Sequence, residues 1–322
     1  MKSQFRITRS AGAILLTFLA FFTLLATSCS NAISTPENRY ALVIGLGTNN
    51  GTVTCANADF DADDMGNLLL TTGWTSVTKL ISSGNGLDTP TSPTYDNIKA
   101  AIDALASEVG NDTSATVLVY YSGHGLATNG YLIPYDATSG SSVTEPAKLI
   151  SPATLSNWLG AAGCKNKILI LDSCYSGNFV DPGSAGDTSP QDSNTATGTT
   201  ETGLLVAAIS NLNTLITASL ERDGDPSILT ISAAGSDEAS YSGTDGTNGT
   251  TVYTNGVFTT FLLDSATHGD RDKDGYVTMT EAYDYAKTGI ATYWNSIWAS
   301  SGAALLPHIS GGAGDLVLFV NQ

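Results

Sequence analysis

Short apolar runs alternate along most of the chain with segments in which apolar residues recur every three or four positions. The short runs predict buried strands at residues 39–45, 77–81, 116–121, 167–171, 228–233 and 316–320. The periodic segments predict helices at residues 61–70, 95–109, 152–159 and 257–263. Because strands and helices alternate, the pattern favours an α/β fold with a mostly parallel sheet and helices on both faces.

The N-terminal residues follow a different pattern. Three basic residues precede an apolar run over 11–25, and small residues then lead to Cys29. This order predicts a signal peptide at residues 1–29 with a lipobox-like end, so that Cys29 carries lipid at a bacterial cell envelope. A cleaved signal that releases a soluble protein and an uncleaved anchor are the alternatives. Residues 30–38 are then a polar tether.

The charge balance restricts the partners. The chain has 13 Lys and Arg residues against 30 Asp and Glu residues, a formal net charge of −17. This charge argues against nucleic acid, whose phosphates require a basic surface, and against docking on anionic lipid head groups through a charged face. A cationic substrate or a divalent cation suits so many carboxylates.

Two predicted strands end in residues that suit nucleophilic catalysis. The third strand continues into His124, which Gly123 and Gly125 flank, and the fourth continues into Cys174. We expect these side chains to share a crevice, because ligands bind at the carboxyl ends of neighbouring parallel strands. A thiol there can attack a carbonyl carbon while the imidazole transfers protons. For either residue alone, a turn histidine or an inert core cysteine is the alternative.

The same segments carry a family resemblance. Tyr-Tyr-Ser-Gly-His-Gly at 120–125 and Asp-Ser-Cys-Tyr-Ser-Gly at 172–177 resemble the metacaspases and bacterial orthocaspases, which are caspase-like cysteine peptidases. Weaker similarities extend the resemblance over roughly residues 39–320. It implies a caspase-like three-layer α/β fold with a mostly parallel six-stranded sheet. It also implies one peptidase domain at 39–322, made of a larger-subunit-like region at 39–180, a mobile linker at 181–227 and a smaller-subunit-like region at 228–322.

The resemblance further implies an endopeptidase mechanism. Cys174 would attack the scissile carbonyl and form an acyl-enzyme, and His124 would handle the proton. The backbone N–H groups of Gly125 and Cys174 would face the oxyanion. The substrates would be proteins or peptides.

Substrate preference follows from acidic residues. The cysteine motif departs from the Gln-Ala-Cys pattern of animal caspases, and the resemblance places Asp61 and Asp172 in the specificity pocket. Two carboxylates near the nucleophile accept a guanidinium or ammonium group, so we expect cleavage after Arg or Lys. Asp59 and Asp63 are alternatives to Asp61. A legumain-like or gingipain-like specificity, or a catalytically silent calcium-dependent surface binding protein, is the alternative function.

Residues 270–281 match the twelve-position EF-hand loop, with acids at positions 1, 3, 5 and 12 and glycine at position 6. Oxygen ligands at this spacing wrap a hard cation, so the loop predicts one Ca²⁺ site of structural or regulatory role. The residues expected to hold the cation are Asp270, Asp272, Asp274, Tyr276, Thr278 and Glu281. An Asp- and Gly-rich turn without metal is the alternative.

Three further residues carry expectations. Cys55 and Cys164 are expected to be separate thiols, although export would permit a disulfide between them. Arg222 is the only Lys or Arg between Lys167 and Arg271. A basic-specific enzyme would therefore have one self-processing bond in that stretch, after Arg222.

Overall fold

The computed structural model describes residues 38–49, 52–53, 55, 57–82, 92–127, 129–139, 142–180, 227–244, 252–312 and 315–321. All of them belong to one compact unit, Pro36–Gln322. The predicted signal peptide, the tether before Asn38, and the linker at 181–226 with Arg222 lie outside the described residues. Among the described helices, none has both the length and the apolar character that a membrane crossing requires.

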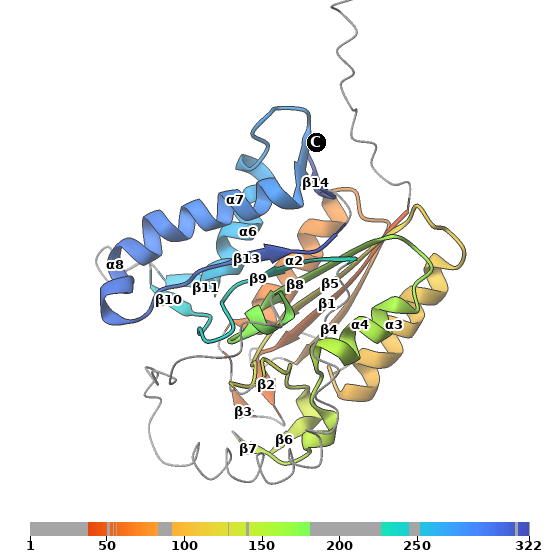
Figure 1. Cartoon of the computed structure of the whole chain (residues 1–322), viewed down its shortest axis with the longest axis horizontal. Coiled ribbons are helices and arrows are strands. Elements are labelled where there is room, and N and C mark those ends of the chain that lie inside the picture. Colours follow the sequence, from red (N-terminus) through yellow and green to blue (C-terminus); the bar gives the residue numbers. More distant parts are fainter. Residues whose placement is uncertain are drawn as a thin grey trace, which may run out of the picture. The chain divides into compact units, whose positions relative to one another are not determined.

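Six strands form the central sheet in the order β13-β9-β8-β5-β1-β4 (Figure 1). They are β1 (Arg39–Leu46), β4 (Ser76–Ser82), β5 (Thr116–Ser122), β8 (Asn166–Asp172), β9 (Ile228–Ser232) and β13 (His308–Ser310). The pairs among the first five strands are parallel, and β13 pairs with β9 in the antiparallel direction. The mostly parallel six-stranded sheet is confirmed.

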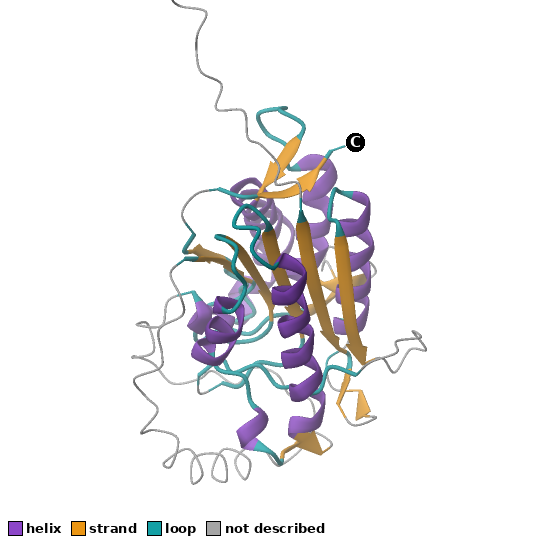
Figure 2. Ribbon diagram, turned by 90° about the vertical axis from the view of Figure 1, so that its right-hand side faces the viewer, coloured by secondary structure: helices purple, strands orange, loops and turns teal. Residues whose placement is uncertain are grey.

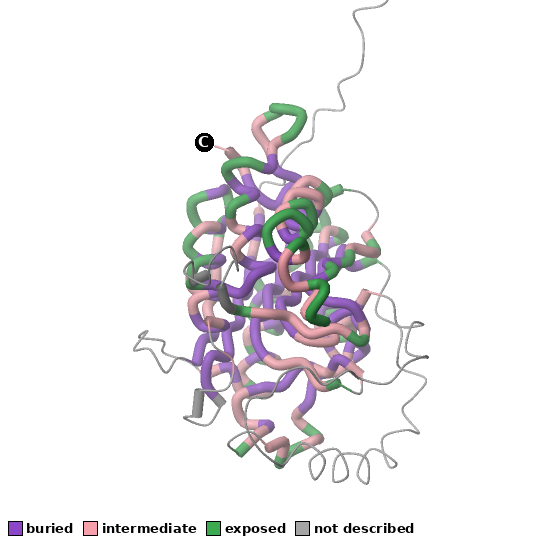
Figure 3. Tube along the Cα trace, turned by 90° about the vertical axis from the view of Figure 1, so that its left-hand side faces the viewer, coloured by how far each residue is buried: buried purple, intermediate pink, exposed green. Residues whose placement is uncertain are grey.

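Helices cover both faces of this sheet (Figures 1 and 2). One face carries α2 (Ala58–Thr71), α6 (Val257–His268) and α7 (Met279–Gly289), and the other carries α3 (Tyr95–Val109) and α4 (Pro152–Gly160). Successive residues of β1 alternate between the two apolar cores, with Val43 in the first and Leu42 in the second. Figure 3 shows buried positions through the interior and exposed positions on the outer turns. The three-layer fold is confirmed.

The last strand differs from the expected sixth strand of the sheet. β14 (Val317–Val320) lies within the predicted segment, but it pairs with β12 (Tyr276–Thr278) in a separate two-stranded sheet. The buried guanidinium of Arg39 holds it there, donating to the carbonyl oxygens of Val317 at 2.5 Å and Leu318 at 2.8 Å. The sixth place in the central sheet belongs to β13, which is three residues long and too polar to form an apolar run.

The remaining elements are short. Three hairpins pair β2 (Thr48–Asn49) with β3 (Thr52–Val53), β6 (Thr138–Ser139) with β7 (Ser142–Val143), and β10 (Ser242–Thr244) with β11 (Val252–Gly256). Single 3₁₀ turns lie at Tyr135–Ala137, Pro146–Lys148, Ser176–Phe179 and Ala299–Ser301, a π-helical turn at Ile290–Asn295, and α8 at Ser296–Trp298. The β10–β11 hairpin leads directly into α6 at Gly256. The N-terminus of α6 is thereby brought to the candidate site.

Candidate active site

The predicted catalytic residues follow two adjacent strands. β5 and β8 are parallel neighbours, and Ser122 at the end of β5 lies opposite Asp172 at the end of β8. His124 and Cys174 each come two residues after this pair. The fold therefore brings the backbones of His124 and Cys174 to the same carboxyl edge of the sheet, where the strand-end argument places them.

Gly125 lies against the backbone of Cys174. A Cβ atom at position 125 would collide with the carbonyl oxygen of Cys174, so only glycine allows this approach. Gly125 also forms an isolated antiparallel bridge with Leu132. The hydrogen bonds of that bridge come from the N–H groups of Leu126 and Ile133, so the bridge does not use the N–H of Gly125.

The thiol of Cys174 lies against the backbone of Ser240, in the segment that follows β9. The Ser240 N–H donates to the sulfur at 3.4 Å, and the sulfur lies 3.8 Å from the Ser240 carbonyl oxygen. Burial raises the pKa of the Cys174 thiol; the Ser240 N–H acts in the opposite direction, and the nearby Asp172 carboxylate adds to the rise. Burial therefore favours the protonated thiol, and a thiol in this state needs a base before it can act as a nucleophile.

Asp61 and Asp172 face one backbone position at the start of α6. A Cβ atom on Gly256 would lie 2.6 Å from Oδ2 of Asp172 and 3.1 Å from Oδ2 of Asp61. Asp61 is only 2% exposed and Asp172 only 5%. Asp61 accepts hydrogen bonds from the Ser122 hydroxyl at 2.6 Å and the Gly256 N–H at 2.7 Å. The structure thus brings the two predicted pocket acids together.

Neutral donors hold Asp172 as well. The hydroxyl of Ser240 donates to Oδ1, while the hydroxyl of Thr259 donates to Oδ2 at 2.7 Å and its N–H at 3.3 Å. Asp61 and Asp172 precede residue 181 in the sequence, whereas Ser240, Gly256 and Thr259 follow residue 227. Segments from both sides of residues 181–227 therefore surround the acidic pair.

Without a bound cation, ionising both carboxyl groups of the acidic pair is unfavourable. Burial raises the pKa of Asp61 well above its usual value, and the neighbouring charge of Asp172 raises it further. Burial also raises the pKa of Asp172, against the hydrogen bonds from Ser240 and Thr259. None of the ion pairs among the described residues includes either carboxylate. A cation bound between them would relieve both the burial cost and the repulsion.

The two alternative acids have other surroundings. The carboxylate of Asp63 forms an ion pair with Lys79 at 2.7 Å. Asp59 is buried at the first turn of α2, where a Cβ atom on Gly47 would lie 2.8 Å from its Cγ. Of Asp59, Asp61 and Asp63, Asp61 is the one that the structure places beside Asp172.

The described cysteines are separate thiols, as predicted. Cys164 is buried in the core beneath α3 and α4. Burial raises the pKa of Cys55, and the charges of Cys174, Asp61 and Asp172 contribute to the rise. Cys55 therefore borders the site, a location that its polar, glycine-rich sequence surroundings did not indicate.

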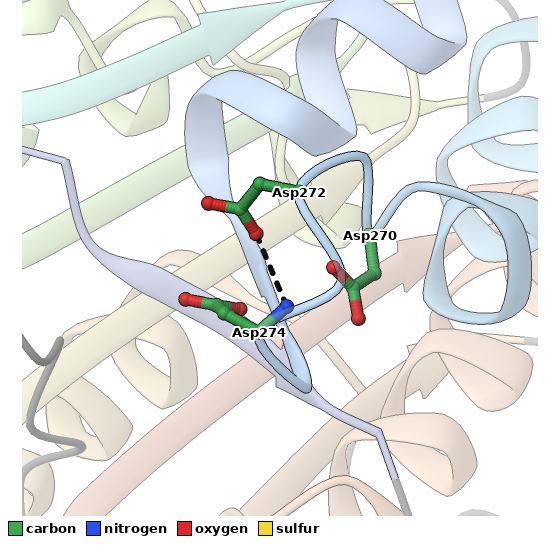
Figure 4. A group of neighbouring side chains, drawn as sticks. All are labelled: Asp270, Asp272 and Asp274. Carbon is green, nitrogen blue, oxygen red and sulfur yellow. Dashed lines mark hydrogen bonds between the residues drawn. The ribbon is translucent and has the colours of Figure 1, made fainter. Parts of the chain in front are cut away.

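The predicted metal loop joins α6 to α7. Ligand oxygens of Asp270, Asp272 and Asp274 all lie within 4.8 Å of one another (Figure 4). Oδ2 of Asp270 accepts from the Gly275 N–H at 3.1 Å, while the buried Oδ1 of Asp270 has no hydrogen-bond partner among the described residues. A cluster of hard carboxylate oxygens with an unsatisfied buried member fits Ca²⁺ chemistry.

The other three predicted metal residues have structural roles. Thr278 is the N-cap of α7 and forms a capping box with Glu281. The helix therefore starts at Met279, and Glu281 lies in its first turn. The Glu281 carboxylate accepts from the N–H groups of Thr278 at 3.0 Å and Arg271 at 3.1 Å, which ties the cap to the loop. Tyr276 lies in β12.

Similarity to known proteins agrees with this geometry. The structure resembles caspase-1 from Spodoptera frugiperda with a TM-score of 0.50 at 13% identity, covering 89% of this chain and 91% of that chain. At this identity the likeness shows the fold alone. No curated protein sequence matches the chain. The family model described as the caspase domain matches residues 38–300, which include both strand ends and the acidic pair. The chain therefore belongs to the caspase-domain family of cysteine peptidases, peptidase C14.

Proposed function

We propose that this protein is an endopeptidase that hydrolyses peptide bonds after Arg or Lys. The observation that carries the proposal is the buried pair of Asp61 and Asp172. This pair lies near the Cys174 thiol, because Ser240 donates hydrogen bonds both to the Cys174 sulfur and to Asp172. A side chain with a guanidinium or ammonium group would neutralise this pair, whereas an aspartate side chain would add a third negative charge. Arg matches the carboxylate geometry better than Lys, because its planar fork donates to two acceptors at once.

In the proposed mechanism, His124 takes the proton of the Cys174 thiol as the sulfur attacks the scissile carbonyl carbon. The carbonyl oxygen becomes an oxyanion that the N–H groups of Gly125 and Cys174 stabilise. The tetrahedral intermediate expels the amine, which receives the proton from His124, and a thioester remains on Cys174. Water, deprotonated by His124, then hydrolyses the thioester and releases the carboxylic acid product.

The test compares fluorogenic peptides that differ only in the residue before the cut: Arg, Lys, Asn or Asp. We expect hydrolysis of the Arg and Lys peptides, and none by the Cys174→Ala variant. Cleavage mainly after Asn or Asp would overturn the basic specificity. Binding of calcium without hydrolysis of any peptide would favour a catalytically silent binding protein.

We also propose that residues 270–281 bind one Ca²⁺ ion. Asp270, Asp272 and Asp274 would supply carboxylate oxygens, Tyr276 its carbonyl oxygen, and Thr278 and Glu281 the remaining oxygens on the side of α7. The convergence of three carboxylates and the unpartnered Oδ1 of Asp270 support this assignment. The ion would brace the junction between α6 and α7, and it takes part in no step of the hydrolysis.

For localisation, we propose export to the bacterial cell envelope with a lipid on Cys29. The support is the sequence order of basic residues, an apolar run and small residues before the cysteine. Mass spectrometry of the N-terminal peptide from membranes of the producing cell tests this. A lipid-modified Cys29 is expected, and an unmodified N-terminus in the soluble fraction would contradict it.

A further inference from the structure

Two hydroxyl groups form a chain of hydrogen bonds that ends at Asp172. The Tyr120 hydroxyl lies 2.5 Å from Oγ1 of Thr259, which lies 2.7 Å from Oδ2 of Asp172. Tyr120 and Thr259 are both completely buried. The three side chains therefore form a dry chain of hydrogen bonds that ends on the acidic pair.

When Asp172 is ionised, the hydrogen bonds in this chain can run in only one direction. A threonine hydroxyl has one hydrogen, and when Thr259 donates it to an ionised Asp172, its oxygen must accept from Tyr120. Burial and the two carboxylate charges raise the pKa of Tyr120 well above its usual value, so its hydroxyl keeps the proton that it donates. Each donor thus favours the charged form of Asp172.

The charges around Asp172 disfavour its ionised form, which the hydrogen bonds from Thr259 and Ser240 favour. Four titratable groups among the described residues interact electrostatically with Asp172, namely Asp61, Cys55, Cys174 and Tyr120, and none of these four carries positive charge. Against them stand the two hydrogen bonds from Thr259 and one from Ser240. Without the Thr259 hydroxyl, Asp172 would protonate at higher pH and lose the contact that fixes Oδ2.

We propose that Thr259, oriented by Tyr120, is a positioning residue that keeps the Asp172 carboxylate ionised and directed toward the cationic side chain of the substrate. This inference rests on the proposed cleavage after Arg or Lys. It concerns binding of the substrate side chain, because Thr259 itself touches no reacting atom.

The test is the pH profile of kcat/KM with an Arg peptide for wild type, Thr259→Val, Thr259→Ser and Tyr120→Phe. Valine keeps the shape of threonine without the hydroxyl, and serine keeps the hydroxyl. Thr260→Val is the matched control, because the Thr260 hydroxyl donates to the Gly256 carbonyl at 2.9 Å in the same helical turn.

For Thr259→Val we expect KM to rise about tenfold to a hundredfold, the range for a lost hydrogen bond to a charged group. The acid limb of the profile should move to higher pH, because the carboxylate needed for binding protonates sooner. Thr259→Ser should behave like wild type, and Tyr120→Phe should show a smaller change in the same direction.

Two results would overturn the inference while leaving the proposed function intact. One is a wild-type acid limb and KM in Thr259→Val, and the other is an equal loss in Thr259→Val and Thr260→Val without a shift of the limb. If Thr259→Val fails to fold, an unshifted limb in Tyr120→Phe overturns it instead. A wild-type enzyme that cleaves no Arg or Lys peptide would overturn the proposed function, and this inference with it.

Discussion

The backbone N–H of Ser240 donates to the sulfur of Cys174 at 3.4 Å. The hydroxyl of the same serine donates to Asp172. One residue therefore contacts both the proposed nucleophile and one member of the acidic pair, and its two hydrogen bonds help to hold the sulfur and the Asp172 carboxylate in place. Positioning of this kind lowers the entropic cost of reaching the reactive geometry.

Cys174→Ala should reduce peptide hydrolysis by several orders of magnitude, because no thiol remains to form the acyl-enzyme. Folding should be nearly unchanged, since Cys174 lies in the turn after β8 and does not fill either core. Cys164→Ala and Cys55→Ala are the controls and should keep activity. Hydrolysis rates with an Arg peptide and circular dichroism melting curves measure both effects, and full activity in Cys174→Ala would refute the nucleophile.

Gly125→Ala should abolish activity, because its Cβ collides with the Cys174 carbonyl oxygen and displaces the proposed oxyanion donors. Gly160→Ala is the matched control. A Cβ at position 160 meets nothing within 4 Å, so activity should stay at the wild-type level. Steady-state kinetics on one peptide compare the two variants. Equal activity in both would contradict the close backbone approach at Gly125.

Asp61→Asn should weaken binding of basic substrates and stabilise the fold. Losing a buried carboxylate that pairs with the substrate cation costs about 2–5 kcal/mol of binding free energy. Burial and the Asp172 charge raise the folded-state pKa of Asp61, so ionising this carboxyl costs more in the folded than in the unfolded chain, and the wild-type protein loses stability as the pH rises above the ordinary aspartate value of about 4. The gain in Tm should therefore be present at pH 7 and vanish near pH 3.

Asp63→Asn is the control for this pH series. Its partner Lys79 is partly exposed, so the change should alter stability by about 0.5 kcal/mol or less and leave kinetics unchanged. Melting curves between about pH 3 and pH 8 make the comparison, because this range begins below the ordinary aspartate pKa and extends well above it. A lower Tm in Asp61→Asn at neutral pH would contradict the repulsion between the two acids.

Calcium should raise the Tm of the protein, because an ion that binds the folded state stabilises it by mass action. Asp272→Asn should reduce this response while leaving the calcium-free Tm nearly unchanged, since Asp272 is exposed and lies outside the capping box. Glu281→Gln should lower both, because Glu281 also caps α7.

The control for the calcium experiment is Asp284→Asn, which removes an acid near the loop that pairs with Arg271 at 3.7 Å. It should retain the full response. Melting curves in calcium and in chelator provide the measurement. A Tm that does not respond to about millimolar calcium, the affinity range of weak extracellular sites, would favour the metal-free turn.

Local sequence signals predicted most of the fold. The helix at 95–109 was predicted at both ends, because its apolar periodicity is regular. The structure adds that Thr94 caps its start. The buried parallel strands were predicted because both of their faces must be apolar. β13 was not predicted, since three residues with one apolar side chain carry no periodicity; its place comes from tertiary pairing with β9.

Local sequence signals also predicted some residues of the candidate site and missed others. The strand-end argument predicted that His124 and Cys174 follow the same edge of the sheet, and the structure has their backbones there because β5 and β8 are adjacent and parallel. Ser240 and Thr259 were missed, since their contacts with Asp172 span 68 and 87 residues and no local pattern encodes them. The only available signal was that both belong to segments that resemble the smaller-subunit region of the family.

The most direct test of the account uses two peptidyl chloromethyl ketones that end in Arg or in Asp. The thiolate of the nucleophile displaces chloride from such a reagent and forms a thioether that peptide mapping by mass spectrometry locates. We predict rapid, stoichiometric modification of Cys174 by the Arg reagent and slow or no modification by the Asp reagent. Preferential labelling by the Asp reagent, or labelling of Cys55 in place of Cys174, would contradict a Cys174 nucleophile beside a pocket for basic side chains.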